Sequence, residues 1–144
     1  CVSASANEIY RISLEEGKFM APLHTDSFIN SMCFNERLNV MFCGGDELEV
    51  WDFRQKERVC KMKSAATVSQ VKCDHTGLLM GMGEGSTLSI FDVRFDRKLL
   101  SLKSSYNEPI NSIHFLNNNE KNIIFSNKKQ IKITNGDGHF ITSV

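Results

Sequence analysis

Short apolar runs alternate with turn-forming residues along the whole chain. Four of these runs share one pattern, in which an aliphatic residue precedes an aromatic residue or its substitute, and they centre on Tyr10, Trp51, Phe91 and Thr134. Successive centres lie 40 to 43 residues apart. Self-similarity at a fixed period of this length is typical of repeat proteins. We therefore expect repeated copies of one small structural unit.

The last three repeats contain further short runs beside their centres. They are rich in β-branched, aromatic and Met side chains and are bounded by Gly, Asn and Asp, which are signals of strands and turns. The further strands expected are Ile29–Phe34, Asn39–Cys43, Val59–Lys63, Val68–Cys73, Leu78–Met82, Leu99–Lys103, Ile110–Phe115 and Asn122–Ser126. The expected turns are Gly44–Asp46, Asp74–Gly77, Asn117–Asn119 and Asn135–Gly138.

Four strands per unit at this period, with Trp51-Asp52 at the end of one strand, resemble the blades of a WD-repeat β-propeller. The predicted fold is all-β: a partial propeller of about three and a half four-stranded blades. We expect a single partial domain over residues 1–144, with blades at about 1–25, 28–64, 67–104 and 109–144. The chain is expected to be a fragment that begins inside one blade, and its open edges are expected to allow self-association.

The composition limits the partners and the cellular setting that we expect for the chain. The chain has 17 Lys and Arg against 17 Asp and Glu, so its overall charge gives no reason to expect a polyanion or a membrane surface as the main partner. Its five cysteines are odd in number and lie in apolar runs, which predicts reduced core thiols. No Asn-x-Ser/Thr acceptor occurs, and no apolar run is long enough to cross a bilayer. We expect a soluble, unsecreted protein.

No motif predicts catalysis, a cofactor or a metal. Gly81–Gly85 resembles a phosphate loop only superficially, because it bridges two strands and no helix follows, so a hairpin turn is expected. The histidines at 24, 75, 114 and 139 lack metal-ligand spacing. We therefore expect no enzyme activity and no small-molecule substrate.

Arg54 and Arg94 occupy equivalent places in consecutive repeats, two residues after Asp52 and Asp92. They are expected to project at the same rim, one blade apart. Each arginine either pairs with the aspartate of its own blade or anchors a partner protein or a phosphate. Doubled motifs of this kind also resemble the box by which propeller substrate receptors dock on cullin-RING ubiquitin ligases.

The local basic cluster of the chain comprises Lys121, Lys128, Lys129 and Lys132. One interpretation is an edge strand that its lysines keep soluble. The other is contact with the backbone of pre-ribosomal RNA, since few aromatic residues accompany the lysines for base stacking.

Several segments resemble, in order, the central propeller region of the nucleolar protein 10 family: Glu8–Leu23, Val50–Arg54, Ile90–Arg94, Asn107–Ile113 and Gly138–Ser143. The resemblance implies a non-catalytic scaffold of the small-subunit processome, which acts in ribosomal RNA processing in the nucleolus, within the nucleus. It implies protein partners in a pre-ribosomal complex and no membrane. The alternative is a substrate receptor of a cullin-RING ligase, docked through Arg54 and Arg94.

Overall fold

A computed structural model describes residues 2–94, 97–117 and 121–144 of the chain, and within these ranges it contains β-strands and no helix. The first sheet holds β1 (Val2–Ser5), β2 (Glu8–Ser13), β3 (Lys18–Phe19) and β4 (Leu23–His24). The second holds β5 (Ser31–Asn35), β6 (Val40–Gly44), β7 (Leu48–Asp52) and β8 (Glu57–Met62). The third holds β9 (Val68–Cys73), β10 (Leu79–Glu84), β11 (Thr87–Asp92) and β12 (Arg97–Lys103). The fourth holds β13 (Ser112–Phe115), β14 (Ile123–Ser126), β15 (Ile131–Thr134) and β16 (Phe140–Ser143).

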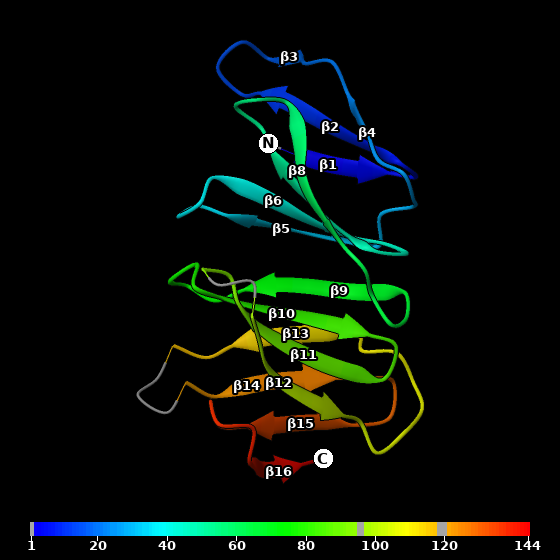
Figure 1. Ribbon diagram of the computed structural model, residues 1–144, viewed down its shortest axis with the longest axis vertical. Coiled ribbons are helices and arrows are strands. Elements are labelled where there is room, and N and C mark those ends of the chain that lie inside the picture. The colour runs from blue at the N-terminus through cyan, green and yellow to red at the C-terminus, as the bar shows by residue number, and fades with distance from the viewer. Residues whose placement is uncertain (1, 95–96, 118–120) are drawn as a thin grey trace.

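The last three sheets are antiparallel meanders in which strand order follows chain order. In the first sheet β1 pairs with one edge of β2, while β3 and β4 both pair with the other edge, so that its last strand is in two pieces. The sheets lie one after another along the long axis of the molecule, with the N-terminus in the upper part of the view and the C-terminus at the bottom (Figure 1). The all-β fold of a partial β-propeller is confirmed.

Apolar side chains fill the spaces between neighbouring sheets. Ile9, Met41 and Trp51 belong to the cluster between the first and second sheets. The largest described cluster lies between the second and third sheets and includes residues of β5 to β7 and β9 to β11, and a further cluster lies between the third and fourth sheets. Because both faces of a sheet are covered, β6 and β7 are buried along their whole length rather than at alternate positions.

The hairpin expected over Gly81–Gly85 is in part wrong. Residues 81–84 continue β10, and the turn begins only at Gly85. The glycines inside the strand are explained by close packing: a Cβ atom on Gly83 would lie 2.9 Å from Cβ of Ile110, in the segment that leads into the fourth sheet. Gly44 is the corresponding residue of β6, where a Cβ would lie 2.6 Å from Cγ1 of Val68. Glycine is needed here because the neighbouring sheet approaches closely.

Candidate interaction surface

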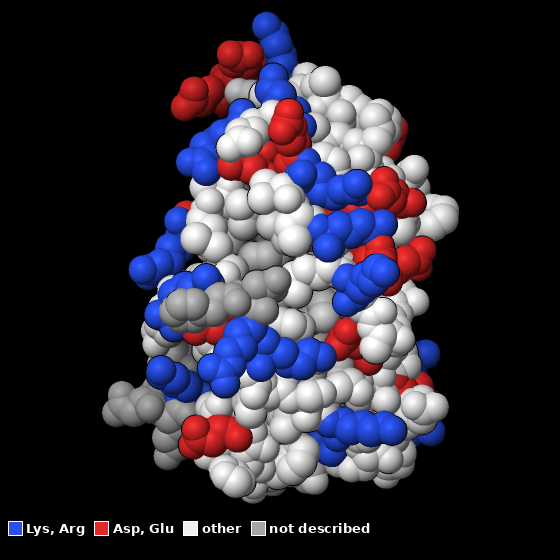
Figure 2. Space-filling view, in the orientation of Figure 1, with Lys and Arg blue, Asp and Glu red and all other residues white. Residues whose placement is uncertain are grey.

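The loops gather at two rims of the stack of sheets. The left rim, at the left of Figure 1, comprises residues 14–17, 35–39, 53–56, 74–78, 93–94, 116–117, 121–122 and 135–139. The right rim comprises residues 6–7, 25–30, 45–47, 63–67, 85–86, 104–111 and 127–130. Lys and Arg side chains lie along both the left and the right of the face in Figure 2, and Asp and Glu side chains lie near them on both sides.

Backbone hydrogen bonds join neighbouring sheets at the right rim. In each case the donor is the backbone amide of a residue at or just before the start of a sheet's first strand. The acceptor is a carbonyl in a hairpin turn of the preceding sheet. The bonds run from Ile29 to Ala6 at 2.8 Å, from Val68 to Gly45 at 2.7 Å and from Ile110 to Gly85 at 2.9 Å. One bond of this kind occurs at each of the three junctions, so the right rim acts as a seam along the stack.

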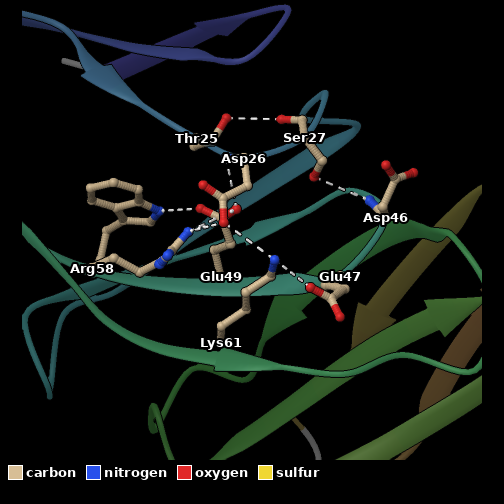
Figure 3. A network of polar contacts seen from close by, with 9 residues as sticks. Thr25, Asp26, Ser27, Asp46, Glu47, Glu49, Arg58 and Lys61 are labelled. Carbon is tan, nitrogen blue, oxygen red and sulfur yellow. Dashed lines mark hydrogen bonds and ion pairs between the residues drawn. The ribbon is translucent and has the colours of Figure 1, made fainter.

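A charged network reinforces this seam between the first and second sheets (Figure 3). Asp26, between β4 and β5, is bound by Arg58 at 2.6 Å and by Lys61 at 3.3 Å, both from β8. Glu49 is 2 % exposed, and it accepts the indole N–H of Trp51 at 3.0 Å and the backbone N–H of Asp26 at 3.1 Å. The hydrogen bonds from Arg58 and Lys61 hold the pKa of Asp26 below its ordinary value.

Between the second and third sheets, Glu84 accepts hydrogen bonds in the same way as Glu49 does between the first and second sheets. Its carboxylate accepts the Ser64 hydroxyl at 2.9 Å, the backbone N–H of Ala65 at 3.2 Å and the Ser89 hydroxyl at 2.7 Å. Burial raises the pKa of Glu84, but these hydrogen bonds and the charge of Lys98 outweigh that effect, so the net shift is downward. The carboxylate is therefore ionised and ties the loop before β9 to the third sheet.

Arg54 and Arg94 lie at the left rim, directly after β7 and β11. Arg54 donates to Asp52 from Nε at 3.2 Å and from Nη2 at 3.0 Å. Arg94 donates to Asp92 in the same way, at 3.0 Å and 2.6 Å. Each arginine thus forms the local pair that the sequence offers as one alternative, and both side chains stay more than half exposed. A docking role for them stays a prediction.

The structure separates the lysines of the basic run. Lys121 lies at the left rim before β14, whereas Lys128 and Lys129 lie at the right rim after it. Lys132 is 7 % exposed, and its Nζ donates to the Ser105 hydroxyl at 2.9 Å and lies 4.5 Å from the ring centroid of Phe140. Its strand, β15, lies between β14 and β16 and is not an edge. The four lysines therefore do not form one patch, and RNA contact stays a prediction for the exposed ones.

The left rim is hollowed between neighbouring sheets. A cavity of about 670 Å³ lies between the segments Cys33–Arg37 and Lys72–Gly77. A smaller cavity, of about 170 Å³, is lined by the charged residues Arg94 and Lys121 and by the apolar residues Leu79 and Phe115. Sequence reasoning missed both, because each cavity joins residues from different repeats and no local motif marks such a meeting.

The cysteines differ in exposure. Cys43 is buried as expected, and desolvation together with the charge of Glu49 raises the pKa of its thiol to about 12. Cys33 and Cys73 are partly buried at the larger cavity, and Cys60 is exposed on β8, so the expectation of a core thiol is wrong for Cys60. Cys1, expected to be a core thiol as well, lies outside the described residues.

The described residues include no group of three or more His, Cys, Asp or Glu side chains that could hold a metal ion. In the same part of the chain, no helix is long and apolar enough to cross a membrane.

Four-stranded antiparallel sheets joined at repeated seams define a β-propeller repeat protein. A family model described as the nucleolar protein 10-like N-terminal domain, a β-propeller, matches residues 1–144. The chain belongs to this family, as the sequence resemblance implied.

Two relatives illustrate the match. Nucleolar protein 10 of Mus musculus is 28 % identical over 158 residues, which cover 97 % of this chain and 23 % of that protein. Ribosome biogenesis protein ENP2 of Saccharomyces cerevisiae is 30 % identical over 146 residues, which cover 92 % of this chain and 20 % of that protein. The chain thus spans less than a quarter of the length of these relatives.

Among solved structures, hydrazine synthase of Kuenenia stuttgartiensis is similar with a TM-score of 0.83 and 9 % identity, over 95 % of this chain and 42 % of that one. At this identity the likeness shows the fold alone.

Proposed function

We propose that this chain is part of a non-catalytic protein-interaction scaffold that acts in ribosome biogenesis in the nucleolus. The names of its relatives, nucleolar protein 10 and ribosome biogenesis protein ENP2, support this role. The observation that carries the scaffold mechanism is the repeated seam at the right rim, which joins all four sheets into one body. Such a body holds exposed rim loops at constant separations, as simultaneous binding of several partners requires.

The test uses the full-length protein that contains this chain, tagged and purified from nuclear extract. Bound proteins are identified by mass spectrometry and bound RNA by sequencing. Recovery of pre-ribosomal proteins with precursor ribosomal RNA is the expected result. Recovery of a cullin ligase without pre-ribosomal material contradicts the proposal and supports the alternative function.

Two matched pairs of variants assign the contacts. Replacing Arg54 and Arg94 by Ala tests partner docking at the left rim, with Arg37→Ala on the same rim as the control. Replacing Lys128 and Lys129 by Ala tests contact with the RNA backbone at the right rim, with Lys63→Ala as the control. A phosphate contact appears as weaker RNA crosslinking and a smaller dependence of RNA binding on salt.

The cullin-RING alternative receives no specific support from the geometry. The guanidinium groups of Arg54 and Arg94 are already engaged by the carboxylates of Asp52 and Asp92. A docking partner would have to share or displace these carboxylates, which lowers the gain from binding.

A further inference from the structure

Two cysteines from different sheets meet at the larger cavity of the left rim. Cys33 lies on β5 of the second sheet, and Cys73 is the last residue of β9 in the third sheet. Both line the cavity of about 670 Å³, together with Lys72 and His75. Both sulfur-bearing side chains are partly buried and also contact the hydrophobic cluster between the two sheets. A small reagent in the cavity therefore reaches a thiol pair that the fold has brought together.

The backbone of β9 explains how the pair is held. This strand is the edge of its sheet, so alternate N–H groups point away from β10 and need other partners. Side chains of β5 provide them: the Ser31 hydroxyl accepts the N–H of Val71 at 3.1 Å, and Sγ of Cys33 accepts the N–H of Cys73 at 3.0 Å.

A comparison of Cys33 with Ser31 shows which properties of Cys33 the fold requires and which it does not. Ser31 and Cys33 perform the same task two residues apart on one strand, and a hydroxyl oxygen accepts hydrogen bonds better than sulfur does. Packing alone therefore does not require a thiol at position 33. What sulfur adds at this position is nucleophilicity and redox chemistry.

The surroundings favour the ionised form of one thiol. Hydrogen bonds from the side chain and the backbone N–H of Cys73, with the charge of Lys72, outweigh desolvation and lower the pKa of Cys33. The same contact raises the pKa of Cys73, since it places a second thiol beside a thiolate. Cys33 is thus the nucleophile of the pair, and Cys73 keeps its proton.

We propose that Cys33 is an oxidant-reactive thiolate and that Cys73 is its resolving thiol, so that hydrogen peroxide converts the pair into a disulfide joining β5 to β9. The Cys33 thiolate attacks one peroxide oxygen, the O–O bond breaks, and hydroxide leaves as Cys33 becomes a sulfenic acid. The sulfur of Cys73 then attacks the sulfur of Cys33, the S–O bond breaks, and water leaves with the Cys73 proton. Each peroxide accepts two electrons and each disulfide releases two.

The geometry permits this bond. Sγ of Cys33 lies 3.0 Å from the amide nitrogen of Cys73, which is only two bonds from Cβ of the same residue. Rotation about χ1 of Cys73, the one torsion that positions its sulfur, therefore moves this sulfur within reach of Cys33.

The first experiment oxidises the full-length protein. The reduced protein is treated with hydrogen peroxide and alkylated, and its peptides are mapped by mass spectrometry. The expected product is a peptide pair linked through Cys33 and Cys73. In the Cys73→Ser variant, dimedone is expected to trap a sulfenic acid on Cys33 instead. A protein in which Cys33 is oxidised no faster than the buried Cys43, or is linked to Cys60, contradicts the proposal.

Cys33→Ser is the informative variant for folding, because serine keeps the hydrogen-bond acceptor and removes the nucleophile. We expect unchanged thermal unfolding and complete loss of the disulfide. Cys60→Ser is the matched control and should leave the disulfide intact. If Cys33→Ser unfolds, Cys33 has a structural role, and the peroxide mapping of the wild-type protein still decides the proposal.

The second experiment measures the alkylation rate of each cysteine by iodoacetamide against pH. The rate at Cys33 should level off with a midpoint well below the value of about 8.5 for an unperturbed thiol, while Cys43 stays unreactive. The midpoint should move upward in Cys73→Ala, which removes the side-chain donor to Cys33. A midpoint at or above about 8.5 for wild-type Cys33 would overturn the assignment of the nucleophile.

Discussion

The two rims of the stack differ in how neighbouring sheets meet. At the right rim, buried carboxylates and repeated backbone hydrogen bonds cross from one sheet to the next. At the left rim, Arg54 and Arg94 bind aspartates of their own sheets, and a cavity of about 670 Å³ separates two loops. Asn35 is a tie at this rim, since its Nδ2 donates to the carbonyl of Gly77 at 2.9 Å. The right rim is therefore tied at every junction between sheets, whereas the left rim has ties between the second and third sheets but also a cavity with room to bind.

The difference shows that charged residues can have different roles on one scaffold. Glu49 is enclosed and satisfies donors that would otherwise be buried without partners, so its removal affects the fold. Arg54 is 64 % exposed in its side chain, and water can replace its contact with Asp52. Enclosure, more than charge, decides whether a group stabilises the structure or stays available to a partner.

The largest loss of stability is expected when Glu49, a buried hydrogen-bond acceptor of the right rim, is removed. Glu49→Ala leaves the indole N–H of Trp51 and the amide of Asp26 without their partner, which should lower the free energy of unfolding by about 3 kcal/mol. Urea unfolding followed by Trp51 fluorescence measures this loss. Glu47→Ala on the same rim removes the ion pair with Lys61 and should cost clearly less. Equal losses for the two variants would contradict the distinction between enclosed and exposed groups.

A smaller effect is expected from the close approach of the sheets. Gly83→Ala introduces a Cβ atom 2.9 Å from Cβ of Ile110, so one sheet has to shift, at about 2 kcal/mol. The exposed Gly136→Ala serves as the control and should change stability little. Thermal unfolding monitored by circular dichroism compares the two variants. A stable Gly83→Ala protein would mean that the third and fourth sheets tolerate wider spacing.

Acid should weaken the right rim before it unfolds the molecule. The pKa values of Asp26 and Glu84 are lowered in the folded state, so the stability they contribute is complete above their unfolded pKa values of about 4. This stability is lost as the pH falls below about 4 through the folded pKa values. Urea midpoints at pH 6 and pH 3 measure the loss, which should be smaller in an Asp26→Asn, Glu84→Gln variant.

The smallest effect on stability is expected at the left rim. Exposed ion pairs of the kind formed by Arg54 and Arg94 contribute little to folding, so changing both to Ala should leave Tm within error of the wild type. A loss of bound partners from this variant, with Tm unchanged, would identify the left rim as a docking surface. A large fall in Tm would show instead that these pairs belong to the framework.

Much of the fold could be predicted from the chain because strand signals are local. The run Val68–Cys73 becomes β9 with the bounds expected, and the expected Asp74–Gly77 turn follows it. The expected strand Ile110–Phe115 begins later, at Ser112, although the amide of Ile110 bonds to the preceding sheet just as the amide of Val68 does. Local patterns thus locate a strand but do not fix the residue at which it begins.

The candidate site was less predictable because closeness in sequence does not imply closeness in space. Lys121 and Lys128 appear together in the sequence, yet β14 carries the chain from one rim to the other between them. Arg94 and Lys121 lie far apart in the sequence and line one cavity. No pattern within a single repeat distinguishes these cases.

The sequence by itself determined the all-β class, the period of about 41 residues and most strands of the last three sheets, because apolar runs and turn residues act through neighbours along the chain. Only the tertiary structure decided that Cys33 meets Cys73, that Lys132 is enclosed, and that carboxylates tie one rim while the other stays open. These outcomes depend on how one sheet is placed against the next, and that placement results from packing and hydrogen bonds between residues some 40 positions apart.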